Sequence, residues 1–473
     1  NTTRRRSLTR TCPAFESVGS TGEPAKPAHM ADVYDPVETR PWDDVLAEAE
    51  RLLPDQLDYL AENSDFYRRR FEEWDLDPYA IGSLDALREV PFTTKDDERR
   101  SQADPLPSRP LGEHQAVPTA ALNRVISSSG TTGKPTYFGL TARDRRDWNA
   151  VQKRAFYAAG VRPEDTVLFG AGQTMITGGT PYFETLTKLG ANVVPAGGEG
   201  TERLLSVALD LSPDVLWTTT SHVRYLSEKA EAVTGVAPPD FSMHKVIGGG
   251  GPGIGNPEIR TEFYDAWDAS LVRECMGLGD VIGCMWAECP AESGMHFHAQ
   301  GHAHVELIDP ETGEAEAFEA GAEGELVYTH LRREATPLLR FRSGDYARVV
   351  GTDCDCGRTS PMIQVVGRAD DMLIFKGMNV FPSAIRDVIS AVPGVAPRLR
   401  VVVPAGQVHF EEPIPVEVAM TPGSDRDESE AVEALVAAVR ERLQVRVDPT
   451  VVGLDDLPPG QYKTKLIDHR DDG

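Results

Sequence analysis

The residue types best suited to chemistry gather in one short stretch, SSSGTTGKPT, at residues 127–136. Its glycines and consecutive small hydroxyl residues let backbone N–H groups curve around an anion, and Lys134 adds a mobile positive charge. The hydroxyl groups can donate hydrogen bonds to phosphate oxygens. Pro135 follows Lys134 where the G-x-x-x-x-G-K-[ST] loop requires a Ser or Thr that starts a helix. The stretch therefore predicts a phosphate loop of a different type, and a flexible surface loop of the same composition is the alternative.

A second set of polar residues is spread over the later chain, in LRFRSGDYARV, VVGRADDMLIFKGMNVFPSAI and PPGQYKTKL. Asp345 belongs to an Arg-Ser-Gly-Asp turn and can accept hydrogen bonds from two hydroxyl groups, as a ribose diol requires. Taken alone, this motif indicates only a turn at the end of a strand. Its position after the Ser/Thr/Gly stretch, and before the other two segments, favours a nucleotide site.

Four residues have the spacing of a metal site: Cys289, His296, Cys354 and Cys356. The pattern is C-x6-H, followed much later by C-x-C. Two short ligand pairs that meet across a β region are what a closed, tetrahedral Zn²⁺ site with three Cys and one His requires. Reduced, buried thiols beside a surface histidine are the alternative that spacing leaves open. Six cysteines in 473 residues are too few for a disulfide framework.

The composition limits the class of function. The chain has 48 Lys and Arg against 74 Asp and Glu, a formal net charge of −26. Long-range repulsion then argues against a protein that coats nucleic acid or an anionic membrane, although a local site can still bind a small anion. Only 10 residues are Lys, so a Lys within a motif is informative. No run of about 18 apolar residues predicts a membrane span.

Between residues 166 and 251, strand-like apolar runs alternate with helical patterns. The runs are TVLFGAG, ANVVPAG, PDVLWTTT and HKVIGGGG, and the helical patterns are PYFETLTKLG, TERLLSVALDL and HVRYLSEKAEAV. This alternation predicts a parallel sheet covered by helices. Earlier, the segment from Trp42 to Phe71 has apolar residues at helical spacing. Later, HAHVELIDPETG and GELVYTHL predict a hairpin-rich β region with a Pro-Glu-Thr-Gly turn.

The chain changes character after Gly367. FPSAIRDVISAV and ESEAVEALVAAVRERL predict helices, and RLRVVVPAG, IPVEVAMTPG and RVDPTVVGL predict strands. We therefore expect a large N-terminal α/β domain at residues 30–367, with helix-covered sheets and a β region. A small C-terminal α+β domain follows at residues 368–473, within the usual size of a domain. Residues 1–29 have the composition of a leader or foreign segment without fixed structure.

These segments resemble the phenylacetate–CoA ligase branch of the adenylate-forming enzymes. That superfamily also contains acyl-CoA synthetases, peptide-synthetase adenylation domains and luciferases. The resemblance runs from about Trp42 to Arg470 and is carried by SSSGTTGKPT, TGGTPYFETLTKLGANVVPAGGEGTERLL, MGLGDVIG, LRFRSGDYA and GRADDMLIFKGMNVFPSAI. It implies a mobile C-terminal domain and two half-reactions. A carboxylate first attacks the α-phosphate of ATP, and a nucleophile, usually the CoA thiol, then displaces AMP.

The resemblance also implies roles for individual residues. Asp345 matches the ribose-binding Asp, Arg368 matches an Arg that contacts the nucleotide, and Asp370 falls at the hinge between the two orientations. The loop would hold the β- and γ-phosphates. The implied nucleotide-binding residues are Ser128, Ser129, Gly130, Thr131, Thr132, Gly133, Gly250, Gly251, Met276, Gly277, Asp345 and Arg368, with Lys134 as a catalytic cation.

The catalytic lysine of the first half-reaction should come from the C-terminal tail. Lys463 is the first candidate and Lys465 the second, because GQYKTKLID aligns in more than one way with the Gly-Lys pattern of the family. Two solvated lysines near a chain end are the alternative. The preceding PPG turn and the order of the motifs favour a catalytic role.

The sequence departs from the family at two motifs. The aromatic-Gly-x-[Ser/Thr]-Glu motif is replaced by Met276-Gly277-Leu278-Gly279-Asp280. Asp280 retains a carboxylate for Mg²⁺, which favours oxygen ligands, but is one methylene shorter. The Gly-Ala-Glu-Pro segment is replaced by Gly249-Gly250-Gly251-Pro252, so its Glu is lost. The two changes affect the expected nucleotide and metal geometry.

By analogy with the family, Ser221, His222 and Gly249 belong to the acyl pocket. The glycine run would leave space for a planar ring, and the polar residues favour an aromatic acid with hydroxyl or amino groups. A core histidine is the alternative for His222. Some members of the branch carry a zinc with ECxxxxGLH and CxCGR patterns, which correspond to ECPAESGMH and CDCGR here. The resemblance therefore also favours a structural Zn²⁺.

Three hypotheses follow for the function. The first is an aryl acid–CoA ligase that uses ATP, Mg²⁺ and CoA. The second is a biosynthetic adenylating enzyme that passes the acyl group to an amine, a hydroxyl or a carrier protein. The third is a catalytically silent nucleotide-binding homologue. We expect a cytoplasmic protein whose partners are small molecules, with no nucleic acid or membrane, and a homodimer by analogy only.

Overall fold

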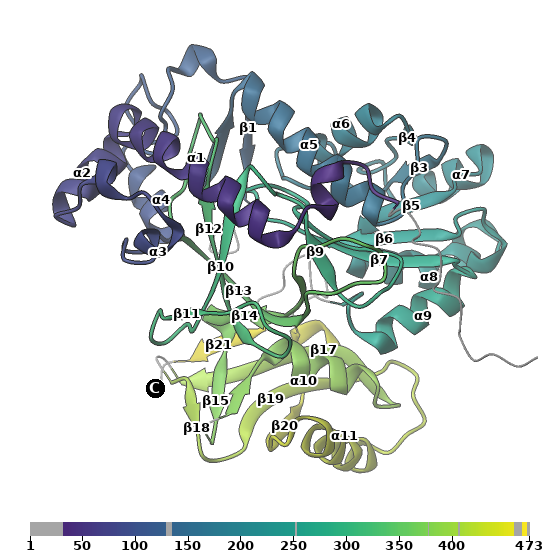
Figure 1. The fold of residues 1–473 in the computed structure, drawn as a ribbon. Coiled ribbons are helices and arrows are strands. Elements are labelled where there is room, and N and C mark those ends of the chain that lie inside the picture. Colours follow the sequence, from purple (N-terminus) through teal and green to yellow (C-terminus); the bar gives the residue numbers. More distant parts are fainter. Residues whose placement is uncertain are drawn as a thin grey trace, which may run out of the picture.

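The computed structural model describes residues 32–128, 135–250, 253–376, 378–404, 407–457 and 466–470. Figure 1 shows a large N-terminal part and, below it, a smaller C-terminal part in yellow and green. A 12-stranded sheet runs through the large part in the order β11-β10-β12-β13-β14-β9-β8-β7-β6-β5-β3-β4. The mixed α/β architecture with a separate C-terminal unit confirms the predicted fold class.

Helices begin the described chain. Their bounds are η1 (Pro36–Thr39), α1 (Trp42–Asn63), α2 (Asp65–Glu73), η2 (Pro78–Ala80), α3 (Leu84–Leu87), α4 (Lys95–Ser101) and η3 (Thr119–Ala121). The helical pattern from Trp42 to Phe71 is confirmed, but it is divided at Ser64. The Ser64 side chain accepts a hydrogen bond from the Tyr67 amide and so caps α2, which separates that helix from α1.

The parallel half of the sheet forms as the alternating pattern predicts. Its strands are β3 (Thr166–Phe169), β4 (Asn192–Val194), β5 (Val215–Thr219), β6 (Lys245–Gly249) and β7 (Leu271–Met276). Its helices are α5 (Ala142–Ala158), α6 (Thr180–Leu189), α7 (Thr201–Leu211), α8 (Thr220–Thr234), η4 (Pro238–Asp240) and α9 (Pro257–Trp267). Neighbouring strands β6 and β7 pair in parallel, as do β5 and β6. A separate hairpin joins β1 (Arg124–Ser127) to β2 (Tyr137–Leu140).

The antiparallel half continues the same sheet. Its strands are β8 (Trp286–Glu288), β9 (Met295–Phe297), β10 (Ala303–Ile308), β11 (Ala315–Glu316), β12 (Glu323–His330), β13 (Phe341–Gly351) and β14 (Met362–Arg368). β10 and β11 form the predicted hairpin, closed by the Asp309 amide and the Glu314 carbonyl. The predicted turn at Arg-Ser-Gly-Asp is wrong, because Asp345 lies inside β13.

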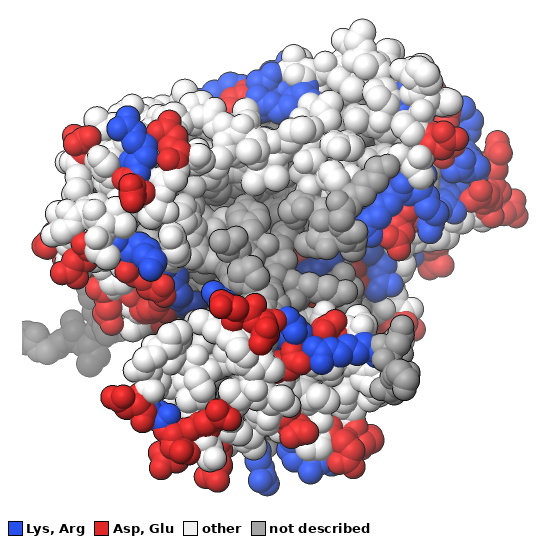
Figure 2. Space-filling view, turned by 180° about the vertical axis from the view of Figure 1, so that it is seen from behind, with Lys and Arg blue, Asp and Glu red and all other residues white. Residues whose placement is uncertain are grey.

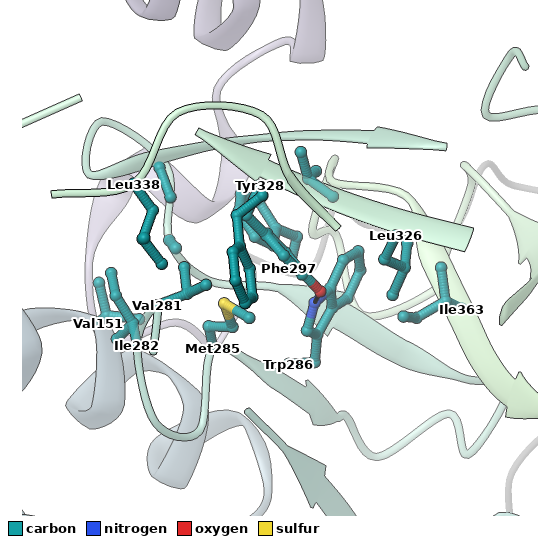
Figure 3. Packing of buried hydrophobic residues seen from close by; sticks show 14 of the residues in the cluster. Val151, Val281, Ile282, Met285, Trp286, Phe297, Leu326, Tyr328, Leu338 and Ile363 are labelled. Carbon is teal, nitrogen blue, oxygen red and sulfur yellow. Dashed lines mark hydrogen bonds between the residues drawn. The ribbon is translucent and has the colours of Figure 1, made fainter. Parts of the chain in front are cut away.

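A large apolar cluster packs against the sheet, and Figure 3 shows many of its residues. Trp286 and Tyr328 are both fully buried, and the Trp286 indole N–H donates to the Tyr328 hydroxyl over 2.9 Å. The hydrogen bond satisfies two polar atoms that burial would otherwise leave unpaired. Met276, at the end of β7, is partly buried and packs against this cluster. The core thus supports the loop that follows β7.

The C-terminal part has its own core. Its elements are η5 (Ala369–Asp371), β15 (Leu373–Phe375), β16 (Met378–Val380), α10 (Pro382–Ser390), β17 (Val395–Pro404), β18 (His409–Phe410), β19 (Ile414–Met420), α11 (Glu428–Leu443), β20 (Val447–Val451), η6 (Leu454–Asp456) and β21 (Ile467–Arg470). Apolar residues of both helices and the four-stranded sheet form one buried cluster. This cluster begins at Leu373, whereas Arg368 still pairs in the large sheet.

Charged side chains are spread over the surface. On the face shown in Figure 2, acidic residues lie around the outline of the molecule beside basic ones. Within the described part of the chain, no helix combines the length and the apolar composition that crossing a bilayer demands.

Candidate active site and metal centre

The carboxyl ends of β5, β6 and β7 lie side by side at one edge of the parallel sheet. Thr219 pairs with Gly249, and Gly249 pairs with Cys275, so the three strands end at the same level. In sheets of this kind, ligands bind at the carboxyl ends of the strands. The predicted acyl-pocket residues and the Met276–Gly277 pair all lie at these ends or follow directly from them. The fold therefore brings together segments that the sequence places tens of residues apart.

His222 and Ser221 occupy the first turn of α8. The Nδ1 atom of His222 lies 2.9 Å from the Thr218 hydroxyl, and the Ser221 hydroxyl lies 3.4 Å from that of Thr219. Burial lowers the pKa of His222 below its ordinary value, which keeps the imidazole neutral at neutral pH. Ser221 is exposed and His222 half-buried. Both can therefore offer uncharged polar groups to a ligand at this edge.

Glycines at the end of β6 are explained by close packing. A Cβ at Gly249 would lie 2.3 Å from the carbonyl oxygen of Cys275, and one at Gly248 would lie 2.4 Å from Ile254. Both positions are buried. The interpretation that the glycine run leaves space for a ring is wrong at Gly249, because the backbone of β7 fills that space. Gly250, which follows, is exposed.

The loop after β7 folds tightly back on itself. A Cβ at Gly277 would lie 2.1 Å from the Cys284 amide nitrogen. His330 holds the loop from β12: its Nε2 atom donates to the Val281 carbonyl over 3.1 Å, while Nδ1 accepts from the Leu338 amide over 2.9 Å. Burial lowers the pKa of His330 to about 3, so the ring stays neutral with this tautomer. The loop is thereby fixed at its centre.

The stem of the predicted phosphate loop is the hairpin of β1 and β2. Ser127 pairs with Tyr137, the Ser128 amide donates to the Thr136 carbonyl over 2.9 Å, and the Thr136 amide donates to the Ser128 hydroxyl over 3.1 Å. The Ser127 amide also donates to the Met175 carbonyl over 2.9 Å. Ser128 is thus part of the stem that closes the loop.

Several predicted residues lie outside the described chain. They are Ser129, Gly130, Thr131, Thr132, Gly133, Lys134, Gly251, Lys463 and Lys465. Asp370 belongs to η5, at the junction of the two domains.

Asp345 and Arg368 form an ion pair across β13 and β14. The two residues are register partners, and Arg368 Nη1 lies 3.0 Å from Asp345 Oδ1 and 2.8 Å from the Ser343 carbonyl. Gly344 has φ of +73°, and a Cβ there would lie 2.3 Å from Arg368 Nη2. The positive φ favours glycine at this position, whereas the guanidinium is the flexible end of a side chain and could move aside. Sequence reasoning did not single out Gly344.

The two domains contact each other beside this pair. The rings of Tyr346 and Phe381 have centroids 5.1 Å apart, and a Cβ at Gly367 would lie 2.5 Å from the Phe381 ring. Farther away, Arg442 of α11 forms a 2.6 Å ion pair with Glu258 of α9. These contacts place the C-terminal domain against the edge where the strands end.

Asp280 has a partner that sequence reasoning missed. The Lys95 ammonium contacts the Asp280 carboxylate and lies 3.2 Å from Glu98 Oε2. Burial, with the nearby Asp280 charge, raises the pKa of Glu98 well above its ordinary value, which favours its protonated form. The residues around Asp280 therefore do not fit a Mg²⁺ ion, which needs several oxygen ligands and tolerates no ammonium among them.

The four predicted metal ligands converge. One ligand atom from each of Cys289, His296, Cys354 and Cys356 lies within 4.8 Å of all the others. Cys289 Sγ is 3.5 Å from Cys354 Sγ, and Cys356 Sγ is 3.4 Å from His296 Nε2. Zn–S bonds of about 2.3 Å place tetrahedral ligand atoms roughly 3.8 Å apart. The donor set and its spacing therefore fit zinc.

Neighbouring groups fix the orientation of these ligands. The Ser360 carbonyl lies 3.1 Å from His296 Nδ1, which directs Nε2 toward the cysteines. The amides of Ala291 and Arg358 donate to the sulfur atoms of Cys289 and Cys356, over 3.4 and 3.5 Å. Such partners hold metal ligands in place and tune them.

A buried ion pair anchors the same region to the start of the described chain. Arg358 Nε donates to Glu38 Oε2 over 2.7 Å, and His298 Nδ1 lies 3.4 Å from the same oxygen. Although burial opposes it, contact with His298 and Arg358 lowers the pKa of Glu38 to about 2. The CDCGR motif includes Arg358, so the sequence indicated that this residue lies near the metal site. No local pattern indicated its partner Glu38, which lies 320 residues away in the sequence.

The chain is similar to known proteins over most of its length. Residues 377–470 match the family model described as AMP-binding enzyme C-terminal domain. The phenylacetate-coenzyme A ligase of Thermus thermophilus is 34% identical over 442 residues, covering 91% of this chain and 96% of that relative. The similarity therefore extends over both domains.

Solved structures of 2-hydroxyisobutyryl-CoA ligase have the same fold. In the postadenylation state with R3-HIB-AMP, that enzyme has a TM-score of 0.81 at 25% identity, covering 94% of each chain. In the thioesterification state with 2-HIB-AMP and CoA, the TM-score is 0.68 at 26% identity, covering 95% of this chain and 94% of that one. The two domains are therefore arranged more as in the postadenylation state.

The two-domain fold, and these similarities along nearly its whole length, define an adenylate-forming CoA ligase. Within that class, the chain belongs to the phenylacetate–CoA ligase family.

Proposed function

We propose that this protein activates an aromatic carboxylic acid with ATP, releases pyrophosphate, and transfers the acyl group from AMP to the thiol of CoA. The observation that carries the proposal is the Asp345–Arg368 pair, which lies between paired strands at the root of the C-terminal domain. A carboxylate there can accept hydrogen bonds from ribose hydroxyls, and its guanidinium partner can approach a phosphate.

The first half-reaction requires positive charge around the α-phosphate, because two anions must approach each other. We assign this charge to Lys134 of the phosphate loop and to Lys463 of the tail, with Lys465 as the second candidate. The β1–β2 stem supports the first assignment, since Ser128 and Thr136 close the hairpin on both sides of the loop. The assignment of Lys463 rests on the order of the motifs.

The second half-reaction requires the C-terminal domain to change orientation. Asp370 lies between the last residue of β14 and the first residue of the C-terminal core, where the chain passes from one domain to the other. A hinge there lets one adenylate be presented first to a lysine and then to a thiol.

For the acyl group, the supporting features are the neutral His222 and the exposed Ser221 at the end of β5. Uncharged donors and acceptors of this kind suit an aromatic acid that carries hydroxyl or amino groups. Because the backbone of β7 occupies the space beside Gly249, we assign the aromatic ring of the substrate to the side of exposed Gly250 and the start of α8.

The cluster of three Cys and one His would hold a structural Zn²⁺ ion. All four protein ligands are present, which leaves no open coordination position, so the ion would stabilise the fold and take no part in the reaction. Its support is the convergence of the four ligand atoms within 4.8 Å. A cytoplasmic location and a homodimer stay predictions from the sequence.

A panel of aromatic acids tests the proposal. Each acid is incubated with the protein, ATP and Mg²⁺, and pyrophosphate release is measured with CoA and without it. We expect one or more acids to release pyrophosphate and CoA to increase turnover. Pyrophosphate release without any thioester would instead favour transfer to an amine, a hydroxyl or a carrier protein. ATP binding without release by any acid would support a silent homologue.

A further inference from the structure

Helix α4 begins with a cation held between two carboxyl groups. Lys95, its first residue, contacts the Asp280 carboxylate and lies 3.2 Å from Glu98 in the next turn of the same helix. The Glu98 and Asp280 side chains are 3% and 10% exposed, and that of Lys95 is 25% exposed. A cation thus fills the position at Asp280 that the motif reserves for a divalent ion.

The other end of α4 is attached to the stem of the phosphate loop. Gln102, which caps the helix, donates from Nε2 to the Tyr137 carbonyl over 2.8 Å, and its Oε1 accepts from the Tyr137 amide over 2.9 Å. Tyr137 is the first residue of β2 and pairs with Ser127 of β1. The side-chain amide of Gln102 therefore binds the hairpin backbone through both of its polar atoms.

Lys95 also contacts that hairpin directly. Its ammonium nitrogen lies 4.5 Å from the centroid of the Phe138 ring, in cation–π geometry. The same nitrogen therefore touches the loop after β7, through Asp280, and the hairpin, through Phe138. Two segments that lie far apart in the sequence meet at one side chain.

We propose that α4 is a positioning element for ATP, in which Lys95 takes the place of a divalent ion at Asp280 and, with Gln102, fixes the phosphate-loop hairpin relative to the loop after β7. This inference rests on the proposed function, because it assigns the phosphate-loop hairpin and the loop after β7 to opposite ends of a bound ATP molecule. Lys95 acts through Asp280 and the hairpin and is a positioning residue.

The proposal predicts different effects on the two half-reactions. ATP spans both loops, whereas the acyl adenylate no longer has the β- and γ-phosphates that the hairpin loop would hold. Loosening α4 should therefore raise the KM for ATP and slow adenylation, and should change thioester formation from a supplied acyl adenylate much less. A merely structural role would affect both reactions alike.

The test uses Lys95→Met, with Lys95→Arg as the conservative variant and Asp96→Asn, at an exposed carboxyl group of the same helix, as the matched control. Acid-dependent exchange of ATP with pyrophosphate reports adenylation, and synthetic acyl adenylate with CoA reports the second step. We expect Lys95→Met to lower kcat/KM for ATP about 10–100-fold, and the second step less than about threefold. Lys95→Arg should recover most of the loss, and Asp96→Asn should stay within about threefold.

A second measurement is independent of turnover. Mn²⁺ binding to the nucleotide-free protein is followed by electron paramagnetic resonance. Lys95→Met removes the ammonium and leaves two carboxyl groups together, so it should gain an Mn²⁺ site that the double variant Lys95→Met/Asp280→Asn lacks. Wild-type protein should not bind Mn²⁺ through Asp280.

Two results would overturn the inference. One is Mn²⁺ binding by wild-type protein that Asp280→Asn abolishes, which would make Asp280 a metal ligand. The other is equal losses in both half-reactions for Lys95→Met. If none of the acids supports pyrophosphate exchange by wild-type protein, the proposed function fails instead, and the Mn²⁺ measurement still decides the role of Lys95.

Discussion

The metal cluster and the proposed nucleotide site lie on the same sheet but are built in opposite ways. At the cluster, the four ligand atoms already lie within 4.8 Å of one another, and neighbouring amides and a carbonyl hold them. At the nucleotide site, the groups come from strand ends, a hairpin and the root of a second domain. A structural ion needs its ligands fixed, whereas two successive half-reactions need groups that can be exchanged.

This difference predicts how each region responds to substitution. Changes at the nucleotide site should reduce rates and leave the folded state intact. Changes at the metal cluster should reduce stability and leave the chemistry of the remaining folded protein nearly unchanged.

Lys463→Ala should lower acid-dependent pyrophosphate exchange by about 10²–10³-fold, because it removes positive charge from the transition state of adenylation. Its melting temperature should stay within about 2 °C of wild type, because we assign this side chain to the reaction and not to packing. Lys465→Ala is the matched control and should retain most of the activity. The reverse result would identify Lys465 as the catalytic lysine.

Cys356→Ser should abolish bound zinc and lower the free energy of unfolding by about 3 kcal/mol or more, because a lost metal ligand unfolds its surroundings. Metal content is measured by mass spectrometry and stability by urea denaturation. Cys284→Ala changes a buried thiol outside the cluster and should keep its zinc. Zinc-free wild-type protein of unchanged stability would contradict a structural metal.

A buried carboxyl group lies between the two regions. Glu274 precedes the end of β7 by two residues, and its amide donates to Glu288, the residue before Cys289, over 2.8 Å. Burial, with the Glu288 charge, raises the pKa of Glu274 to about 8, although Arg260 opposes the shift. The group is therefore neutral in the folded protein at pH 7.

The sign of the pH dependence follows from this shift. An unfolded Glu ionises near its ordinary pKa, so the contribution of neutral Glu274 to stability is complete below about pH 4.5 and falls as the pH rises toward 8. Glu274→Gln lacks this dependence. Its stability relative to wild type should increase by about 3–4 kcal/mol between about pH 5 and pH 8, at up to about 1.4 kcal/mol per pH unit. Parallel urea curves that keep a constant difference would contradict a neutral Glu274.

Asp345→Asn should raise the KM for ATP about tenfold, because a hydrogen bond to a charged group contributes roughly 1.5–3 kcal/mol. The KM for CoA should change less than about threefold. Steady-state kinetics with each substrate varied in turn measures both values. An unchanged KM for ATP would remove Asp345 from the nucleotide site.

Arg442→Glu should have the smallest effect. Its ion pair with Glu258 joins the two domains, but both side chains are about half exposed, and such pairs contribute about 0.2–1 kcal/mol. We expect adenylation to slow by less than about fivefold, because the pair belongs to the postadenylation-like arrangement. The charge exchange Arg442→Glu/Glu258→Arg should restore the rate. Failure of the exchange would show that the pair does not favour this arrangement.

Local patterns predicted most of the fold. The alternation of strands and helices at residues 166–251 and the C-terminal helices all form where the pattern places them. The prediction of a turn at Asp345 was wrong because a glycine such as Gly344 is typical of turns, yet here its positive φ occurs within strand β13. A glycine has several uses, and the sequence alone does not distinguish them.

The parts of the candidate site that belong to short sequence motifs could be predicted from the sequence. The four metal ligands converge because their spacing reflects two short pairs on neighbouring β segments. Lys95 and Glu38 were missed, because their partners lie 185 and 320 residues away and no local pattern records a long-range ion pair. The space at Gly249 was misjudged for the same reason, since the strand that fills it comes later in the chain.

The products of the complete reaction distinguish an AMP-forming acid–CoA ligase from the alternatives. The protein is incubated with ATP, Mg²⁺, CoA and the acid that gives the fastest pyrophosphate release, and the products are quantified by mass spectrometry. We predict one AMP and one aryl-CoA thioester for each ATP consumed. Stoichiometric AMP without thioester, or formation of ADP, would contradict an AMP-forming acid–CoA ligase.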